Sequence, residues 1–505
     1  MFRWKATAAA SVIVASLALA GCSPADEQAE ASPDLVLSAI IAPTTLDPAG
    51  SEWGNRAPFY EAVFDTLIRQ SPDGELLPSI ATEWVYDDAQ TELTLTIREG
   101  VEFTDGTPLD AAAVVANLER FQSGTSPDAG YFAGVTSFDA PDATTVVITL
   151  GAPDPAMLNY LSRDAGLIAS PASFDSADLA TNPVGSGPYM LDAGRTVTGT
   201  SYVYTANPDY WNPEEVLYET LTINVLSDPT AALNAIKAGE ANGVRLINND
   251  SRDEIEATGW TVETNELDFQ GFLLLDRAGT ASEPLGDVRV RQAINYAVDR
   301  EGLLQALAKG YGTVTQQVFP ESSAAYDPEL DSYYEYDPEK AKELLAEAGY
   351  PDGFSISMPS STFFGAAPYT IMAQQLADVG ITAEYTDPGN NFIADLLAPK
   401  FPAAFMALEQ NSDWQLIQFM ISPTAVFNPY KYADPEVDAL IATVQTGTEE
   451  ERNDAAAEIN RIMVEDAWFA PFYRVEGGFA VDANTTARML PTNAYPSLFD
   501  IEPAS

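Results

Sequence analysis

The stretch Arg98–Leu109 reads REGVEFTDGTPL and lies between a strand pattern and a helix pattern. Before it, Glu92–Ile97 (ELTLTI) alternates polar and apolar residues, which is typical of a strand with one buried face. Within it, Asp105-Gly106 is a turn signal. From Thr107 onward, the order Thr-Pro-Leu-Asp favours a helix start, and the helix is predicted to run to about Phe121. A strand, a turn and a helix in so short a stretch indicate a mixed α/β fold.

Strand and helix patterns continue to alternate along the chain. Further strands are predicted at Asp34–Ile41, Thr144–Leu150 and Thr220–Leu226, and a helix with one buried face at Asn55–Arg69. Three Asp-Pro pairs are expected to open helices, because Asp caps free backbone N–H groups and Pro supplies a helical φ: Asp228-Pro229, Asp337-Pro338 and Asp434-Pro435. Left-handed helix ends are expected at Gly239, Gly349 and Gly380, and a capping box at Thr448–Glu451 before a helix that ends near Asp466.

The composition excludes several functional classes. The 505 residues carry 24 Lys and Arg against 75 Asp and Glu, a formal net charge of −51. A nucleic acid must be met with basic residues, so no nucleic-acid partner is expected. The chain has no histidine and one cysteine, which removes histidine-based catalysis, histidine metal sites and disulfides within the chain. The chain is also long enough to form two or three domains with a large core.

The N-terminus has the features of a secretory signal. Arg3 and Lys5 precede the small and apolar run Ala6–Gly21, which is shorter than the roughly 20 residues of a transmembrane helix. The run ends Leu19-Ala20-Gly21-Cys22, which resembles the bacterial lipobox, so Cys22 is expected to be lipidated. Residues 1–21 would then be a lipoprotein signal peptide and residues 22–33 a flexible tether, at the outer face of the bacterial cytoplasmic membrane. An ordinary signal with a stray cysteine and a short membrane anchor are the alternatives.

No motif indicates catalysis or a bound cofactor. The Gly-rich segment Val184–Tyr189 (VGSGPY) lacks the GK[ST] of a phosphate-binding loop, so a turn or an interdomain crossover is expected there. None of the Asp-Gly turns continues into a calcium loop. We therefore expect no cofactor, no metal and no enzyme activity. Loop aromatic residues are better candidates, because such residues often line ligand pockets: Trp53, Phe363, Phe364, Trp414 and Phe419.

An ordered series of segments resembles one family, the extracellular solute-binding proteins of ABC importers, family 5, the peptide/nickel/oligopeptide class. The resemblance runs from about Asp34 to the C-terminus, and the Arg98–Leu109 segment resembles the best-known signature of the family. The other matching segments are Thr45–Pro48, Tyr60–Leu67, Leu77–Ala81, Val184–Tyr189, Asn207–Trp211, Val288–Asp299 and Tyr336–Gly349. The lipobox adds support, since many such receptors are lipoproteins.

The resemblance implies a two-lobed clamshell of the type II periplasmic-binding-protein kind, with an additional small domain. Lobe one would comprise residues 34–48, 182–277 and 476–505, the additional domain residues 49–181, and lobe two residues 278–475. A solute would be captured between the lobes and delivered to the permease transmembrane subunits of an ABC importer by a receptor expected to be a monomer. Closure of the lobes over the solute would be a hinge motion.

The ligand class stays open at this stage. Peptide-binding members commonly place an aspartate in lobe two against the peptide N-terminus; its position falls near Asn411, with Asp413 and Glu409 close by. Some dipeptide binders carry an arginine near the segment matching Met358–Thr362, and none is present there. Nickel is disfavoured because histidine is absent. The expected ligand-binding residues are Glu52, Trp53, Phe364, Glu409, Asn411, Asp413 and Trp414.

Two other readings of the function are kept. A peptide or oligopeptide is the first expectation, and the alternative is the same receptor role for an oligosaccharide, an opine-like compound or a cationic small molecule. A secreted carboxylate-dependent hydrolase is a remote alternative, because two of the many acidic residues could act as a catalytic pair. No spacing singles out such a pair.

Overall fold

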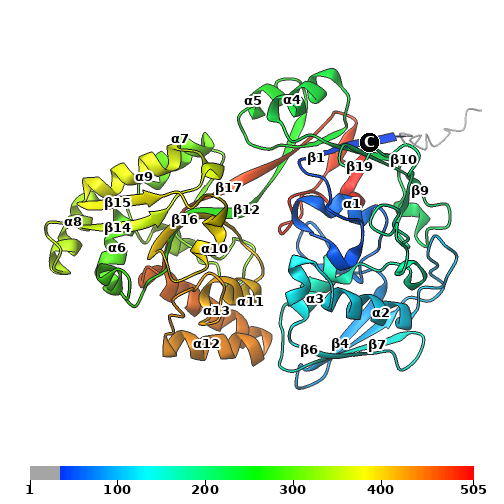
Figure 1. Ribbon diagram of the computed structural model, residues 1–505, viewed down its shortest axis with the longest axis horizontal. Helices are drawn as coiled ribbons and strands as arrows, with labels where there is room; N and C mark the ends of the chain where they lie inside the picture. The colour runs from blue at the N-terminus through cyan, green and yellow to red at the C-terminus, as the bar shows by residue number, and fades with distance from the viewer. Residues whose placement is uncertain (1–33, 505) are drawn as a thin grey trace, which may run out of the picture.

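The computed structural model describes residues 34–504, and the predicted signal peptide, Cys22 and the predicted tether lie outside them. The chain forms two halves joined by two long strands (Figure 1). Helices and strands alternate, as predicted for a mixed α/β fold. Within the described residues, no helix combines the length and the apolar character needed to cross a membrane.

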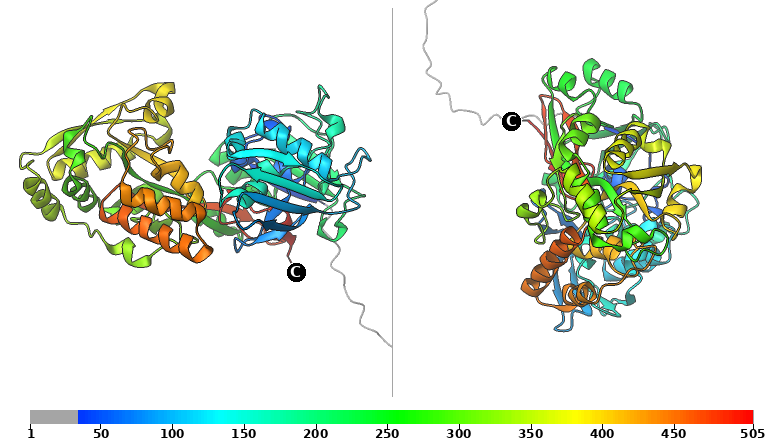
Figure 2. Two further views of the ribbon diagram at one scale, coloured as in Figure 1. Left: turned by 90° about the horizontal axis from the view of Figure 1, so that it is seen from below. Right: turned by 90° about the vertical axis from the view of Figure 1, so that its left-hand side faces the viewer.

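One nine-stranded sheet runs through both halves. Its order is β16-β12-β17-β11-β1-β10-β9-β8, and β13 pairs with β17. β12 and β17 are the longest strands and extend from one half into the other (Figures 1 and 2). The strands are β1 (Asp34–Ala39), β8 (Tyr189–Leu191), β9 (Ser201–Ala206), β10 (Thr220–Val225), β11 (Gly243–Arg245), β12 (Thr261–Leu274), β13 (Gly312–Val314), β16 (Ala403–Glu409) and β17 (Phe469–Val481).

The pairing of β12 with β17 is irregular at two places, with the extra residue in β12 at the first and in β17 at the second. The register of β12 on β17 shifts between Glu266 and Asp268 and again between Gln270 and Gly271. A Cβ on Gly271 would lie 2.5 Å from the Cα of Pro471, so glycine allows the strands to approach there. Bulges bend a strand and increase its twist. The connection between the halves is therefore bent at defined residues.

The half around β1 is called lobe one, and it carries a small antiparallel sheet of order β4-β5-β7-β6. This sheet, together with the helices on it, is called the small domain (Figure 1). Its elements are β4 (Ala81–Tyr86), β5 (Glu92–Ile97), α2 (Ala111–Gln122), β6 (Val135–Asp139), β7 (Thr145–Leu150) and α3 (Met157–Leu161). Lobe one also contains α1 (Ala57–Glu61), β2 (Ile68–Gln70), β3 (Leu76–Pro78), α4 (Pro229–Ala238), α5 (Arg252–Glu256), β18 (Thr485–Ala487) and β19 (Ile501–Pro503).

The strand–turn–helix prediction around Arg98–Leu109 is confirmed, with a different cap. β5 spans the predicted strand, and α2 is capped by Asp110, whose side chain accepts from Ala113 N. Thr107 instead closes the turn: its backbone N lies 2.9 Å from Asp105 Oδ1, and its hydroxyl also donates to that carboxylate. The helix therefore starts later than Thr107.

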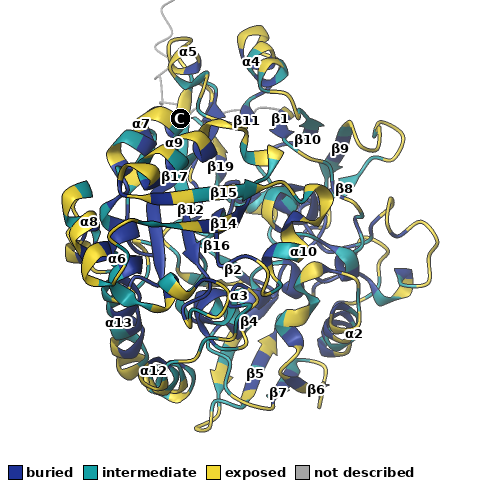
Figure 3. Ribbon diagram, turned by 60° about the vertical axis from the view of Figure 1, so that its left-hand side comes forward, coloured by how far each residue is buried: buried dark blue, intermediate teal, exposed yellow. Residues whose placement is uncertain are grey.

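The other half, called lobe two, packs helices around β14, β15 and β16 (Figure 3). All three predicted Asp-Pro caps form, and Thr448 and Glu451 make the predicted capping box. Gly239 ends α4 in the left-handed conformation, as predicted. The helices and strands of lobe two, in addition to its part of the large sheet, are α6 (Val288–Tyr296), α7 (Arg300–Ala308), α8 (Pro338–Glu347), β14 (Phe354–Pro359), α9 (Ala367–Asp378), β15 (Ile381–Thr386), α10 (Phe392–Leu396), α11 (Asp413–Leu416), α12 (Pro435–Thr446) and α13 (Glu449–Glu465).

The helix predicted at Asn55–Arg69 is wrong over most of its length. Only α1, Ala57–Glu61, is α-helical, and the chain reaches β2 at Ile68. The backbone after α1 is instead bound by the VGSGPY segment: Gly187 N donates to Val63 O at 2.8 Å, and Tyr189 N donates to Ala62 O at 2.8 Å. The helical spacing of apolar residues reflected a buried irregular segment, because Val63 and Phe64 are fully enclosed.

Candidate functional site

A polar cavity of about 570 Å³ lies between the small domain and lobe two. Its walls come from segments far apart in sequence and contain many side-chain amides and hydroxyls. The volume is within the range of small-molecule sites. The polar lining residues are Gln70, Asp73, Asn159, Ser162, Arg163, Ser322, Ser323, Gln410, Asn411, Ser412, Asp413, Gln415, Glu449, Arg452, Asn453 and Thr492.

Asp413 supplies a partly buried carboxylate to this cavity. It is the first residue of α11, directly after the loop that follows β16. Within residues 34–504, its carboxylate accepts a hydrogen bond from the hydroxyl of Ser323 and forms no ion pair. Burial raises the pKa of its carboxyl group above the ordinary value. A cationic group entering the cavity would remove this desolvation penalty.

Gln410 offers a free acceptor beside Asp413. Its side chain is only 2% exposed. Its Nε2 donates to Val318 O at 2.8 Å, which leaves Oε1 without a partner. Its backbone N donates to Leu267 O at 2.9 Å, the residue at the first bulge of β12. An unpaired buried carbonyl is costly, so Oε1 is suited to accept an N–H group of a ligand.

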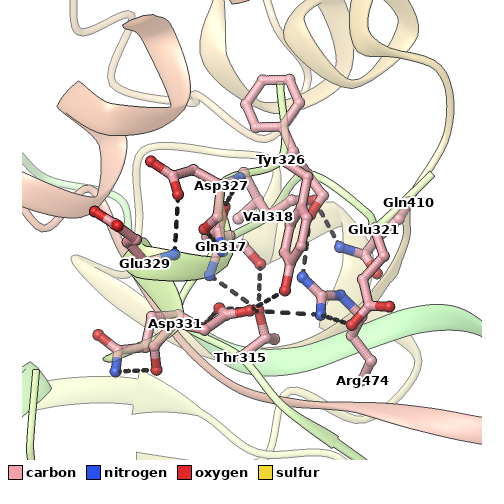
Figure 4. A network of polar contacts seen from close by, with 12 residues as sticks. Thr315, Gln317, Val318, Glu321, Tyr326, Asp327, Glu329, Asp331, Gln410 and Arg474 are labelled. Carbon is pink, nitrogen blue, oxygen red and sulfur yellow. Dashed lines mark hydrogen bonds and ion pairs between the residues drawn. The ribbon is translucent and has the colours of Figure 1, made fainter. Parts of the chain in front are cut away.

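The loop that carries Ser323 is held against the long strands by Arg474 of β17. Figure 4 shows the side chains gathered around its guanidinium. Arg474 Nη1 lies 3.6 Å from Glu321 Oε1 and 3.8 Å from Asp331 Oδ2, and the guanidinium stacks over the Tyr326 ring at 5.2 Å. Tyr326 in turn donates to Asp331 at 2.7 Å. The wall of the cavity is thus attached to the strand that joins the lobes.

Arg163 bridges the small domain and lobe two at the edge of the cavity. Its Nη2 lies 3.2 Å from Glu409 Oε1, and its Nη1 lies 3.3 Å from Asn411 Oδ1. Nη2 also donates to the carbonyl of Thr492, in the C-terminal segment. One arginine therefore ties three parts of the chain together around the cavity.

A second cavity of about 740 Å³ lies on the other side of this bridge. Asn411, Trp414 and Gln415 line both cavities and form the partition between them. Trp414 is 7% exposed and its indole also bonds Asp154 of the small domain. The two cavities are adjacent compartments of one interlobe space.

The structure brings four of the seven expected ligand-binding residues together. Glu409, Asn411, Asp413 and Trp414 follow one another at the end of β16 and line one or both cavities. Their contact with a ligand stays a prediction.

The other three expected residues line neither interlobe cavity, although the small space that Trp53 borders shares Gln70, Ser162, Arg163 and Thr492 with the polar cavity. Trp53 is 6% exposed and borders a small internal space of about 30 Å³. Glu52 is paired with Arg56 at 2.5 Å and accepts from Thr44. Phe364 packs edge-on against Phe405 in lobe two, with 5.1 Å between ring centroids.

Sequence reasoning missed Gln410 and both arginines of the cavity. No arginine lies in Met358–Thr362, which disfavours a zwitterionic dipeptide, but Arg163 and Arg452 reach the cavity from the small domain and from α13. Arginine is scarce in this acidic chain, and that scarcity was the one available signal. Which arginines converge depends on how the lobes pack. Within residues 34–504, no group of three acidic or cysteine side chains is arranged to hold a metal ion.

Comparison with known proteins matches this architecture. The family model described as bacterial extracellular solute-binding proteins, family 5, middle part, matches residues 75–435. The glutathione-binding protein GsiB of Salmonella paratyphi A is 28% identical over 488 residues, which cover 91% of this chain and 92% of GsiB.

Two solved structures share the fold. HbpA2 from Haemophilus parasuis superposes with a TM-score of 0.82 at 22% identity, over 94% of this chain and 100% of that structure. The ABC transporter-associated periplasmic binding protein DppA from Helicobacter pylori, in complex with the peptide STSA, superposes with a TM-score of 0.76 at 20% identity, over 94% of this chain and 98% of that one. The fold is that of a type II periplasmic binding protein, as expected. The chain therefore belongs to the family 5 bacterial extracellular solute-binding proteins of ABC transporters, which are binding proteins and not enzymes.

Proposed function

We propose that this chain is the lipid-anchored receptor of an ABC importer and that it captures a short peptide between its lobes. The peptide is then delivered to the transmembrane subunits of the permease. Cys22 carries the lipid anchor after removal of residues 1–21, and residues 22–33 tether the receptor to the outer face of the cytoplasmic membrane. Lobe one comprises residues 34–48, 182–277 and 476–505, the additional domain 49–181, and lobe two 278–475.

The observation that carries this proposal is the charge pattern of the polar cavity. Asp413 is a partly buried carboxylate without a cationic partner in residues 34–504, while Arg163 and Arg452 line the same space. A peptide with free ends presents an ammonium group, a carboxylate and amides between them. Each of these groups needs a partner of the opposite kind when it leaves water. Asp413, the two arginines and Gln410 Oε1 supply such partners.

The relatives support a peptide-like ligand. GsiB is named for glutathione, and the DppA structure holds the peptide STSA. A ligand that bridges the lobes stabilises the closed arrangement, because it adds contacts that exist only there. The permease then has a closed, loaded receptor to recognise. The ligand-binding residues of this proposal are Glu409, Asn411, Asp413 and Trp414, together with Arg163, Gln410 and Arg452.

The test begins with the ligand that the protein itself retains. Native mass spectrometry of the purified protein should show an added mass that fragments into amino acids. Titration calorimetry with di- to tetrapeptides should then give saturable binding. Acetylation of the peptide N-terminus, or the variant Asp413→Asn, should each weaken binding by about tenfold or more, since each removes one partner of a buried charge pair.

The two changes also control for each other. In Asp413→Asn, the acetylated and free peptides should bind with similar affinity, because the ammonium no longer has a carboxylate to meet. Asp88→Asn, in the exposed turn before β5, is the matched control and should leave affinity unchanged. Peptide binding with full affinity in Asp413→Asn would show that the N-terminus lies elsewhere.

A non-peptide ligand is the alternative that the same experiment decides. A single retained mass without amino-acid fragments, together with no response to any peptide, would replace the peptide by an oligosaccharide, an opine-like compound or a cationic small molecule. The receptor role would be unchanged.

A further inference from the structure

The second interlobe cavity, called the aromatic chamber, has walls of a different kind from the first. It encloses about 740 Å³ between the small domain and the α11 region of lobe two. Its larger apolar lining residues include Tyr131, Leu150, Met157, Tyr160, Trp414, Phe419 and Val426. Because it meets the polar cavity at Asn411, Trp414 and Gln415, a group attached to a ligand in one cavity can enter the other.

Aromatic side chains line two sides of the chamber. Tyr131 and Tyr160 stack in parallel in the small domain, with centroids 4.3 Å apart and planes 7° apart. Trp414 and Phe419 lie on the lobe two side, and Phe419 is held edge-on by Phe427 at 4.7 Å. Aromatic faces attract cations as well as apolar groups.

The charges around the chamber all have one sign. Asp128, Asp154 and Glu409 line it, and its described lining contains no lysine or arginine. Only Glu409 has a cationic partner there, Arg163, which reaches it from the polar cavity. Burial raises the pKa of Asp154 to about 6, although the backbone of Ala156 and the indole of Trp414 donate to it. The carboxylates are therefore short of positive charge.

These features favour one kind of ligand group over others. An anion would meet three carboxylates and no basic side chain, which costs free energy. A neutral apolar group would fit the rings but leave Asp128 and Asp154 without a cationic partner. A cation on an alkyl stem places methylenes against Met157 and Val426, its charge near the carboxylates and its face on the aromatic rings.

We propose that the aromatic chamber binds an alkylammonium or alkylguanidinium group. This group has two sources: the lysine or arginine side chain of a peptide held in the polar cavity, or a free organic cation. The first source rests on the proposed peptide function, and the second does not.

Two titrations separate these sources. The first compares n-butylguanidinium with its neutral counterpart n-butylurea, by titration of the purified protein followed by NMR. The second compares the peptide Ala-Arg-Ala with Ala-citrulline-Ala, in which a neutral urea replaces the guanidinium, by calorimetry. The charged member of each pair is expected to bind about tenfold more tightly or better.

The variant Asp128→Asn/Asp154→Asn should abolish this preference. Asparagine keeps the side-chain oxygen that accepts from Ala156 N, and the melting temperature verifies that the variant is folded. Asp139→Asn on β6, outside both cavities, is the matched control and should keep the full preference. The citrulline peptide should bind the double variant and the unaltered protein with the same affinity. This result would show that the substitutions remove only the recognition of the positive charge.

The combined results of the two titrations test the chamber proposal and the peptide proposal separately. If arginine and citrulline peptides bind equally and butylguanidinium binds no better than butylurea, the chamber proposal is overturned and the peptide receptor stands. If no peptide binds but butylguanidinium binds in a way the double variant loses, the chamber takes a free cation and the peptide function fails. If neither peptides nor butylguanidinium bind, both proposals are overturned.

Discussion

At the scale of single residues, Arg163 is the side chain that joins the small domain to lobe two. It reaches Glu409, Asn411 and the carbonyl of Thr492 from a position just after α3. Within residues 34–504, its pair with Glu409 is the only ion pair between the small domain and lobe two. Other contacts across this interface join a side chain to an uncharged acceptor, such as Gln445 Nε2 to Pro153 O at 3.0 Å and Arg452 Nη1 to Gln90 Oε1 at 3.3 Å. A largely buried arginine whose partners lie on different lobes should influence both closure and binding.

We expect Arg163→Ala to open the ligand-free protein and to weaken peptide binding by about tenfold or more, because it leaves Glu409 without its cationic partner. Small-angle X-ray scattering measures the first effect as a larger radius of gyration, and calorimetry measures the second. Arg195→Ala is the control, since Arg195 is an exposed arginine paired locally with Asp192. An unchanged radius together with unchanged affinity in Arg163→Ala would mean that the bridge does not hold the lobes.

At the scale of elements, the VGSGPY segment packs tightly against the backbone that follows α1 and is not a ligand-binding loop. A Cβ on Gly185 would lie 2.1 Å from Val63 O, and one on Gly187 would lie 2.5 Å from the carbonyl carbon of Val63. Only glycine lets this backbone approach the segment that follows α1. The contact explains both the glycines of the segment and the early end of the predicted helix at Asn55–Arg69.

We therefore expect Gly185→Ala to lower the free energy of unfolding by about 2 kcal/mol, because the added methyl group overpacks the contact with Val63 and Phe64. Urea denaturation followed by circular dichroism measures the change. Gly54→Ala is the matched control, since nothing lies within 4 Å of the Cβ it would add. Equal stability of the two variants would show that the backbone can shift to admit the methyl group.

At the scale of the whole molecule, burial sets the pH dependence of several carboxyl groups. Burial raises the pKa of Glu61 to about 7 and the pKa of Asp65, Asp154 and Asp268 to about 6. In the unfolded chain these groups titrate near pH 4. Between these values the folded protein binds more protons than the unfolded chain, so the free energy of unfolding falls as the pH rises.

The melting temperature should accordingly fall between about pH 5 and about pH 8. The measurement is made in about 1 M sodium chloride, which screens the general repulsion of the acidic surface. Glu61→Gln should flatten the profile in its upper part, because glutamine can still accept from Leu498 N and does not titrate. A melting temperature that rises over this interval, or a slope that Glu61→Gln leaves unchanged, would contradict the assignment.

Local signals predicted most elements of the fold because their physics is local. Asp228, Asp337 and Asp434 each cap the helix that follows in sequence, and the Thr448 capping box closes within a single turn. The Asn55–Arg69 helix failed because its apolar spacing is produced equally by a buried irregular segment. What distinguishes the two is the contact with Gly185 and Gly187, more than a hundred residues away.

The sequence predicted those residues of the candidate site that lie in one segment. It did not predict those that come from other, distant segments. Glu409, Asn411, Asp413 and Trp414 are close in sequence, so one resemblance placed all four. Arg163 and Arg452 come from distant elements and carry no local mark.

By itself, the sequence determined the class of the protein. The ordered motifs, the absence of histidine and the lone Cys22 already indicated an α/β binding protein without metal or disulfide chemistry. Only the tertiary structure decided which charges meet. Burial and charge pairing depend on distances between lobes, and these follow from how β12 and β17 bend and how the small domain packs on lobe two. Asp413 facing the polar cavity and three carboxylates facing the aromatic chamber are consequences of that packing.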